Sequence, residues 1–183
     1  GERRFAERLV SHLEDDYLCW YDVPIGPRGL HPDFLVLHPR RGILVLEVKD
    51  WKLDTIQRID KYTATLAIAG KLKRETNPLE QAREYAHAVK DLLETDPALV
   101  AAPGTPYQGR LMLPWGHGVV LTNISRKAFS STDLGQVIPP ERVICQDEMT
   151  ESVEPEAFQS RLWGMFGVTF ACLLTMPQIE RIR

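Results

Sequence analysis

Three residues with side chains suited to metal and phosphate chemistry lie within residues 31–51. Asp33 stands at the start of one apolar segment, and Glu47 and Lys49 stand at the end of the next. Two carboxylates, with the backbone carbonyl of Val48 as a further ligand, suit Mg²⁺, which prefers hard oxygen ligands and keeps several waters. A bound divalent ion activates water, and a lysine beside it stabilises developing charge on a phosphate. These residue types therefore indicate metal-assisted cleavage of a phosphodiester bond.

A β-hairpin is the local structure that must position these side chains. The pattern predicts strands over 33–38 and 43–49, joined by a short turn. Side chains alternate across a strand, so Glu47 and Lys49 share one face. A reversal centred on residue 40 or 41 places Asp33 opposite residues 47 to 49 of the antiparallel partner. The hairpin therefore predicts that Asp33 and Glu47 share one ion.

The remaining elements predict a sheet flanked by helices. Helices are expected at 2–14, 77–94 and 155–175, and further strands at 17–23, 116–123 and 142–146. A second, more polar hairpin is expected over 54–75, with its turn at Ala69 and Gly70. The strands of the first hairpin are almost continuously apolar, which indicates a sheet covered on both faces. This order predicts a mixed α/β (α+β) fold with a central mixed sheet.

Composition limits the function classes. One domain over residues 1–183 is the default for this length, and 44% hydrophobic with 26% charged residues is typical of a soluble globular protein. No apolar run reaches the roughly 18 residues that a membrane span needs. Three scattered cysteines without a CxxC pair disfavour a disulfide framework or a zinc site and suit the cytoplasm. The net charge of -3 means that a nucleic acid must be bound through a local patch or a metal.

Local basic clusters are the candidates for such a patch. They could follow phosphates beside the acidic site, although ordinary solvated charge is the alternative for each residue alone. Trp51, next to the hairpin, could stack on a base or simply close the hairpin. The candidate phosphate contacts are Arg40, Arg41, Lys71, Lys73 and Arg74.

These segments, in this order, resemble a known family. HPDFLVL followed by GILVLEVKDW is similar to the motif of the PD-(D/E)XK nuclease superfamily, and Gln81 and Tyr85 match its Q-x-x-x-Y helix element. The opening Gly1-Glu2, the ending EVKDW and NPLEQA resemble the nuclease-related domain family, NERD. VVLTN and VICQDEM resemble NERD domains that precede a UvrD-like superfamily 1 DNA helicase.

The resemblance implies a restriction-endonuclease-like core with a defined site. The two hairpin carboxylates would bind Mg²⁺ or Mn²⁺, and Lys49 would be the catalytic lysine. Glu2 would contact the metal through water, with Glu7 as the competing candidate. Gln81 and Tyr85 would lie on a helix beside the site, where they touch DNA or orient the lysine.

The expected function is therefore a metal-dependent deoxyribonuclease domain that acts with a helicase in DNA repair or processing, as part of a longer protein. A non-catalytic DNA-binding or docking module of a helicase is the first alternative. A metal-binding protein with a substrate other than nucleic acid is the second.

Overall fold

The computed structural model describes all 183 residues. The strands are β1 (Leu18–Tyr21), β2 (Phe34–His38), β3 (Gly42–Lys49), β4 (Ile56–Ile59), β5 (Thr63–Ile68), β6 (Lys71–Thr76), β7 (Trp115–Leu121) and β8 (Val143–Cys145). The helices are α1 (Glu2–His12), α2 (Pro78–Glu94), α3 (Arg126–Ser130), α4 (Pro155–Trp163) and α5 (Met176–Ile182). None of these helices combines the length and the apolar character that crossing a membrane requires.

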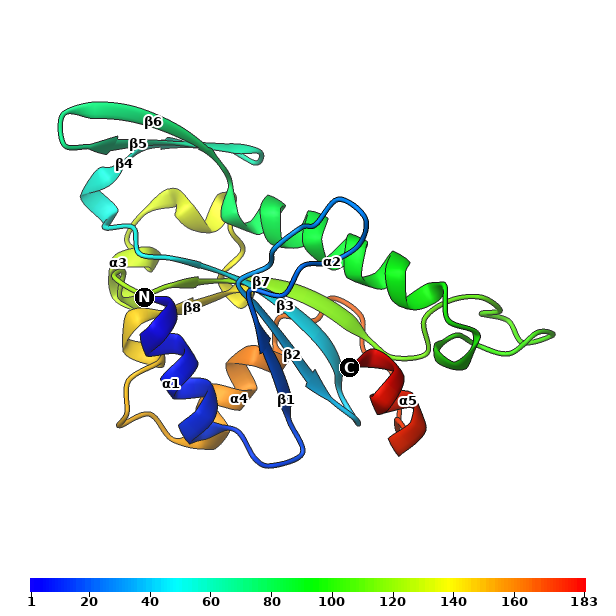
Figure 1. The fold of residues 1–183 in the computed structure, drawn as a ribbon. Coiled ribbons are helices and arrows are strands. Elements are labelled where there is room, and N and C mark those ends of the chain that lie inside the picture. Colours follow the sequence, from blue (N-terminus) through cyan, green and yellow to red (C-terminus); the bar gives the residue numbers. More distant parts are fainter.

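A five-stranded mixed sheet forms the centre of the molecule, with the strand order β1-β2-β3-β7-β8 (Figure 1). The first three strands are antiparallel neighbours, whereas β7 and β8 run parallel to β3. In the β2–β3 pair, Phe34 lies opposite Leu46 and His38 opposite Gly42. This register confirms the predicted hairpin, and it places position 33 level with position 47 just beyond the end of β2.

Helices cover both faces of this sheet, with α2 on one side and α1 and α4 on the other (Figure 1). Phe5 of α1 packs with Leu44 and Leu46 of β3, while Val89 of α2 packs with Val45 of β3. Alternate residues of one strand thus enter two different cores. Burial on both faces explains the nearly continuous apolar runs and confirms the mixed α/β fold.

A second sheet follows β3 and contains the strands β4-β5-β6. The predicted turn at Ala69 and Gly70 is confirmed, because both residues have positive φ values of 50° and 76°. The prediction of a simple hairpin over 54–75 was incomplete, since β4 adds a third antiparallel strand. Trp51 is 9% exposed and packs against Ala64 and Leu66 of this sheet. Burial of its ring favours the structural role over the expected stacking on a base.

The predicted helix over 155–175 was wrong beyond Trp163. The helix α4 ends there with Gly164 as its C-cap, and residues 164–175 contain no helix or strand. Gly167 and the β-branched residues around it weaken helix propagation. Phe158 of α4 is fully buried, whereas Leu173 is 61% exposed, so the apparent apolar period joined two unrelated segments.

Candidate active site

Asp33 and Glu47 meet at the end of the β2–β3 hairpin. The backbone N–H of Asp33 donates a hydrogen bond to Oε1 of Glu47 at 3.3 Å. The N–H of Val48 donates in turn to Oδ2 of Asp33 at 2.7 Å. Glu47 is only 2% exposed, and Asp33 is half-buried. The hairpin therefore brings both carboxylates into one place, as its predicted register requires.

The pKa values of both carboxyl groups are raised. Burial, reinforced by the negative charge of Asp33, raises the pKa of Glu47 to about 8. Burial also raises the pKa of Asp33, and the charge of Glu2 acts in the same direction. The Lys49 ammonium group lowers both pKa values but does not outweigh the burial. A poorly solvated pair of carboxylates is a site where a divalent cation would be strongly favoured.

Lys49 lies on the same strand face as Glu47, two residues further along β3. It is half-buried and forms no ion pair in the structure. Its Nζ atom lies 6.0 Å from the centre of the Trp51 ring, the outer range of a cation–π contact. The lysine is thus held beside the carboxylates without being neutralised by either of them.

Glu2 approaches the pair from the N-terminal turn of α1. The hydroxyl group of Tyr21 donates a 2.6 Å hydrogen bond to Glu2, and the charge of Glu2 acts on Asp33. Glu7, the competing candidate, is exposed and lies 3.5 Å from Arg3 in an ion pair. The position of Glu2 is the better suited to a contact through water.

The donor atoms at the pair suit one kind of metal. No group of three or more His, Cys, Asp or Glu side chains in the structure could hold a metal ion. Two carboxylates remain, and the Val48 carbonyl points to the same side of β3 as its N–H, which binds Asp33. Mg²⁺ and Mn²⁺ accept such a set, because Mg²⁺ is usually bound by one or two carboxylates plus waters and phosphate oxygens. A closed structural zinc centre does not fit, since it needs four ligands.

The helix α2 carries the other two predicted residues. Its start is well defined, because Asn77 is a fully buried N-cap that accepts a hydrogen bond from the N–H of Leu79 at 2.9 Å. One turn later, Nε2 of Gln81 donates to the hydroxyl oxygen of Tyr85 at 3.1 Å. Both side chains are half-buried on the helix that covers this sheet face, and neither is hydrogen-bonded to Lys49. Their mutual bond is therefore the contact that the structure assigns to them.

Arg40 and Arg41 do not lie beside the carboxylates, contrary to expectation. They form the turn at the opposite end of the hairpin, six residues along β3 from Glu47, or about 20 Å at the rise of a strand. The Arg41 guanidinium group lies 5.4 Å from the centre of the Trp163 ring. The strand direction, which the local charge cluster does not reveal, separates these arginines from the site.

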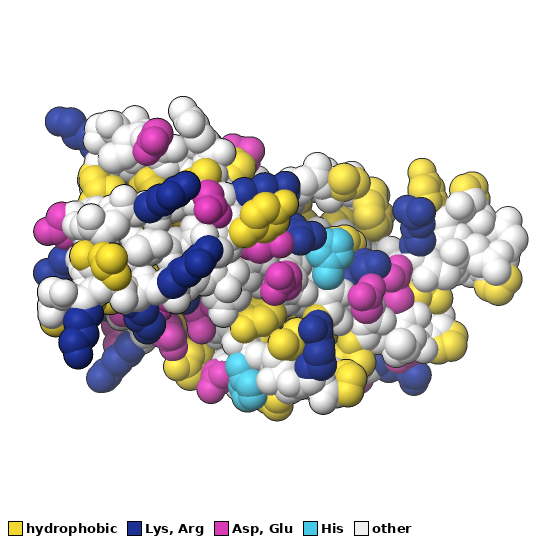
Figure 2. Space-filling view, turned by 90° about the horizontal axis from the view of Figure 1, so that it is seen from above, with side chains coloured by type: hydrophobic (Ala, Val, Ile, Leu, Met, Phe, Trp, Pro, Cys, Tyr) yellow, Lys and Arg dark blue, Asp and Glu magenta, His cyan; other side chains and the backbone are white.

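The basic residues of β6 divide between the two faces of the small sheet. Arg74 lies opposite Thr65, which lies opposite Arg58 of β4, so the two arginines share one face. Both are exposed and form no ion pair. Lys71 and Lys73 alternate onto the other face, where Lys73 is paired with Glu75 at 3.0 Å. Figure 2 shows that Lys and Arg side chains gather at this end of the molecule.

The alignment of Arg58 with Arg74 was not predicted because the hairpin expected over 54–75 did not include β4 as a separate strand. Nothing in the local sequence distinguishes Arg58 from an ordinary surface arginine. The signal that would have found it is the cross-strand register of a three-stranded sheet, which aligns Arg58 with Arg74. The structure thus separates Arg74 from Lys71 and Lys73 and places it on the same face as Arg58.

Asp50, directly after β3, links the end of β3 to the residues that follow β7. Its carboxylate accepts a hydrogen bond from the Thr122 hydroxyl group, and its backbone carbonyl accepts one from the Asn123 amide at 2.7 Å. Arg4 of α1 donates to the carbonyl oxygen of Thr122 at 3.1 Å. These bonds fix the position of α1, and hence of Glu2, relative to the strand that carries Glu47.

One of the comparisons with known proteins found a match to the chain. Neither the curated proteins nor the solved structures contain a match to the chain. The model of the nuclease-related domain, NERD, matches residues 1–120, which include the carboxylate pair, the lysine and all of α2. The match covers well over half of the 183 residues. The chain therefore belongs to the nuclease-related domain family.

Proposed function

We propose that this protein is a divalent-metal-dependent deoxyribonuclease. Its active site, formed by Asp33, Glu47 and Lys49, would hydrolyse phosphodiester bonds of DNA. The observation that carries the proposal is the buried carboxylate of Glu47 beside half-buried Asp33, with the unpaired Lys49 on the same strand face as Glu47. Family membership supports a nuclease-related role at the coarser level. The donor set supports Mg²⁺ or Mn²⁺ as the ion.

Each residue would have a distinct part in the reaction. Bound Mg²⁺ or Mn²⁺ would supply an activated water and neutralise charge on the scissile phosphate. Asp33 and Glu47 would hold the ion, with the Val48 carbonyl as a further ligand and Glu2 in contact through water. Lys49 would orient the attacking water or stabilise the extra negative charge of the pentacoordinate phosphate. The low exposure of Glu47 would strengthen these electrostatic interactions.

The small sheet would hold the DNA backbone next to this site. Arg58 and Arg74 present two unpaired guanidinium groups on one exposed face, where phosphates can be contacted without competition from an ion-pair partner. The small sheet follows β3 in the sequence. Trp51, two residues after Lys49, packs against Ala64 and Leu66 and so anchors this sheet near the end of β3. Gln81 and Tyr85, which lie on α2, would contact the DNA strand.

The role in the cell would be DNA repair or processing together with a superfamily 1 helicase. This part of the proposal rests on the resemblance of VVLTN and VICQDEM to NERD domains that precede UvrD-like helicases. In the fold, VVLTN ends β7 beside Asp50, where Thr122 donates a hydrogen bond to the Asp50 carboxylate, and VICQDEM contains the edge strand β8.

A non-catalytic DNA-binding or docking module is the second candidate function. It is favoured by the absence of a third acidic or histidine side chain close enough to complete a metal cluster. In that case the arginine face of the small sheet would bind DNA, and the carboxylate pair would remain without a catalytic role.

Cleavage assays separate these two functions. Single- and double-stranded DNA would be incubated with Mg²⁺ or Mn²⁺ and with wild-type protein, Asp33→Asn, Glu47→Gln or Lys49→Met. We expect cleavage by the wild type and loss of cleavage in all three variants, with Glu7→Gln as the control that keeps activity. Cleavage that survives all three changes would falsify the nuclease proposal. Metal-independent DNA binding without any cleavage would favour the docking module.

A further inference from the structure

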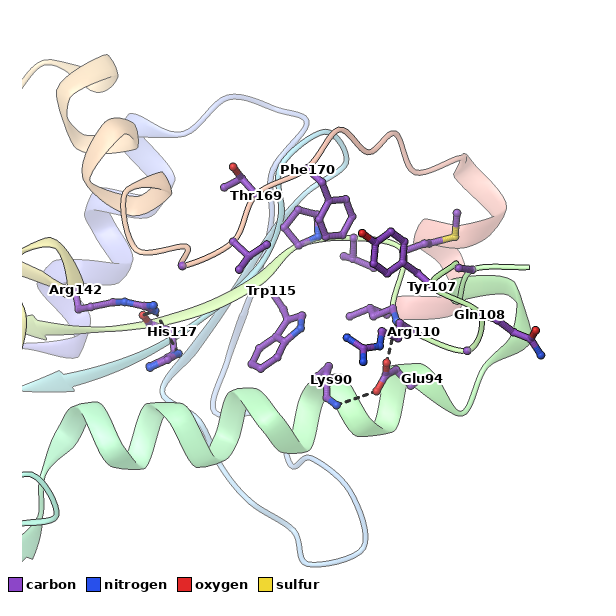
Figure 3. A pocket seen from close by; sticks show the side chains of 18 residues that line it. Lys90, Glu94, Tyr107, Gln108, Arg110, Trp115, His117, Arg142, Thr169 and Phe170 are labelled. Carbon is purple, nitrogen blue, oxygen red and sulfur yellow. Dashed lines mark hydrogen bonds and ion pairs between the residues drawn. The ribbon is translucent and has the colours of Figure 1, made fainter. Parts of the chain in front are cut away.

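A cavity of about 1190 Å³ lies away from the carboxylate pair (Figure 3). It is formed by the C-terminal half of α2, the segment 101–115, the start of β7 and the segment 167–170. The carboxylates and the Gln81–Tyr85 pair do not line it. This volume is somewhat above the range of about 300–1,000 Å³ that is typical of small-molecule sites. The cavity is therefore a second site rather than an extension of the first.

Aromatic side chains line one part of this cavity. Tyr107 is 69% exposed and Phe170 is 47% exposed, although both belong to its wall. Trp115 is half-buried, and its ring makes an edge contact with His87 at 4.9 Å between ring centres. These aromatic residues come from three separate segments of the chain. Exposed aromatic surface that converges on a hollow indicates a partner with a flat apolar group.

A half-buried cation lies at the other end of the cavity. Arg142 donates a hydrogen bond to the backbone carbonyl of His117 at 3.0 Å and forms no ion pair with any carboxylate. The charge of Glu141 acts on Arg142, but the two side chains are not in contact as an ion pair. Burial and the charge of Arg142 lower the pKa of His117 to about 4, so this imidazole is neutral. An unpaired guanidinium group at such depth favours an anionic ligand.

The other charges of the cavity leave it positive. Lys90 is paired with Glu94 at 2.9 Å, and Glu94 also accepts a hydrogen bond from the N–H of Leu111. The acidic group of the wall is thus already satisfied. Arg110 lines the cavity, is exposed and has no ion-pair partner. The two unsatisfied charges, on Arg110 and Arg142, are both positive.

The spacing of the aromatic and cationic groups matches one ligand class. Trp115 and His117 are two residues apart on one strand face, about 7 Å along β7. Figure 3 shows Trp115 between Arg142 and His117 on one side and Tyr107 and Phe170 on the other. A nucleotide has this arrangement, since one sugar separates its planar base from its phosphate. We propose that the cavity binds a nucleotide, with the base against the aromatic residues and the phosphate at Arg142, on the other side of Trp115.

Calorimetric titration with adenosine 5′-monophosphate tests this proposal. The protein would be titrated in chelator, so that no metal links the nucleotide to the carboxylate pair, with adenosine and inorganic phosphate as separate ligands. We expect the nucleotide to bind at least about ten-fold more tightly than either part alone, because stacking and charge act together. Glu47→Gln should bind equally well. No binding of the nucleotide, equal binding of adenosine or phosphate, or loss of binding in Glu47→Gln would each overturn the proposal.

Matched variants locate the bound nucleotide. Phe170→Ser changes an exposed residue of the wall, so folding should be preserved, and binding should weaken by about ten-fold. Leu173→Ser removes a similarly exposed apolar side chain outside the wall and should leave binding unchanged. Arg142→Gln retains a donor for the His117 carbonyl and should weaken binding of the nucleotide but not of adenosine. Equal affinities in Phe170→Ser, Leu173→Ser and the wild type would show that the base lies elsewhere and refute the assignment.

Discussion

Replacing Glu47 by glutamine is expected to stabilise the metal-free protein at pH 8 while it abolishes cleavage. The amide keeps an oxygen that accepts the 3.3 Å hydrogen bond from the N–H of Asp33, and it has nearly the same volume. What it removes is a negative charge that is buried beside another carboxylate. The site is thus predicted to be a place where the protein gives up stability in order to bind a cation.

The sign and size of this effect follow from the pKa of Glu47. Its pKa is raised from 4.5 to about 8 in the folded protein. The folded state then holds the proton more tightly than the unfolded chain, so the resulting stability is complete below pH 4.5 and is lost as the pH rises to about 8. At about 1.4 kcal/mol per pKa unit the upper limit is roughly 5 kcal/mol, and relaxation around the buried charge reduces it to an expected 2–4 kcal/mol.

Urea unfolding of wild type and Glu47→Gln at pH 5 and pH 8 measures this difference. The variant should gain 2–4 kcal/mol over the wild type, as estimated above, when the pH is raised from 5 to 8 without metal. Adding Mg²⁺ at pH 8 should stabilise the wild type and leave the variant nearly unchanged, because binding to the folded state raises stability. The reasoning is refuted if the variant is no more stable than the wild type at pH 8, or if Mg²⁺ stabilises both proteins equally.

Three further predictions address other parts of the structure. Lys49→Met should lower the cleavage rate about 100-fold or more yet keep the stabilisation by Mg²⁺, and loss of both would show that the lysine only supports the fold. Arg74→Ala should weaken DNA binding and reduce the slope of log affinity against log salt by about one, whereas Arg40→Ala should change neither. Equal effects of the two variants would contradict DNA binding by the face of the small sheet that carries Arg74. Gly42→Ala should destabilise the protein by about 2 kcal/mol or more in thermal unfolding. The φ angle of Gly42 is 123°, and a Cβ atom at this position would lie 2.1 Å from the Pro114 carbonyl oxygen. Unchanged stability would argue against this close approach.

The hairpin that carries the carboxylates could be predicted from the sequence because its information is local. Two apolar runs, a short turn and strand alternation determine the register within a residue. The observed pairing of Phe34 with Leu46 places Asp33 level with Glu47, within the range that the turn predicts. The helix over 77–94 was equally accessible, because its N-cap and its period are both local signals.

Features that depend on the packing of distant segments could not be predicted in this way. Arg40 and Arg41 are near the carboxylates in sequence, but the extended strand carries them to the far end of the sheet. Arg58 and Arg74 are distant in sequence, but β5 aligns them on one face. Spacing along the chain therefore did not show that Arg40 and Arg41 lie far from the carboxylates, or that Arg58 and Arg74 share one face.

The C-terminal region shows the limit of periodicity alone. The apolar residues beyond Trp163 were in phase with the helix, but Gly164 ends it, and the segment 167–170 instead forms part of the cavity wall. That cavity combines segments from α2 to Phe170, and no local pattern links Tyr107 to Phe170. Its arginine and aromatic residues acquire meaning only in three dimensions.

Binding of Mn²⁺ measured by electron paramagnetic resonance tests the central claim most directly, because the account depends on a cation at Asp33 and Glu47. Wild-type protein should bind Mn²⁺, excess Mg²⁺ should displace it, and Asp33→Asn combined with Glu47→Gln should bind at least about 100-fold more weakly. Glu7→Gln should bind as the wild type does. Equal Mn²⁺ binding by the wild type and the double variant would contradict the account.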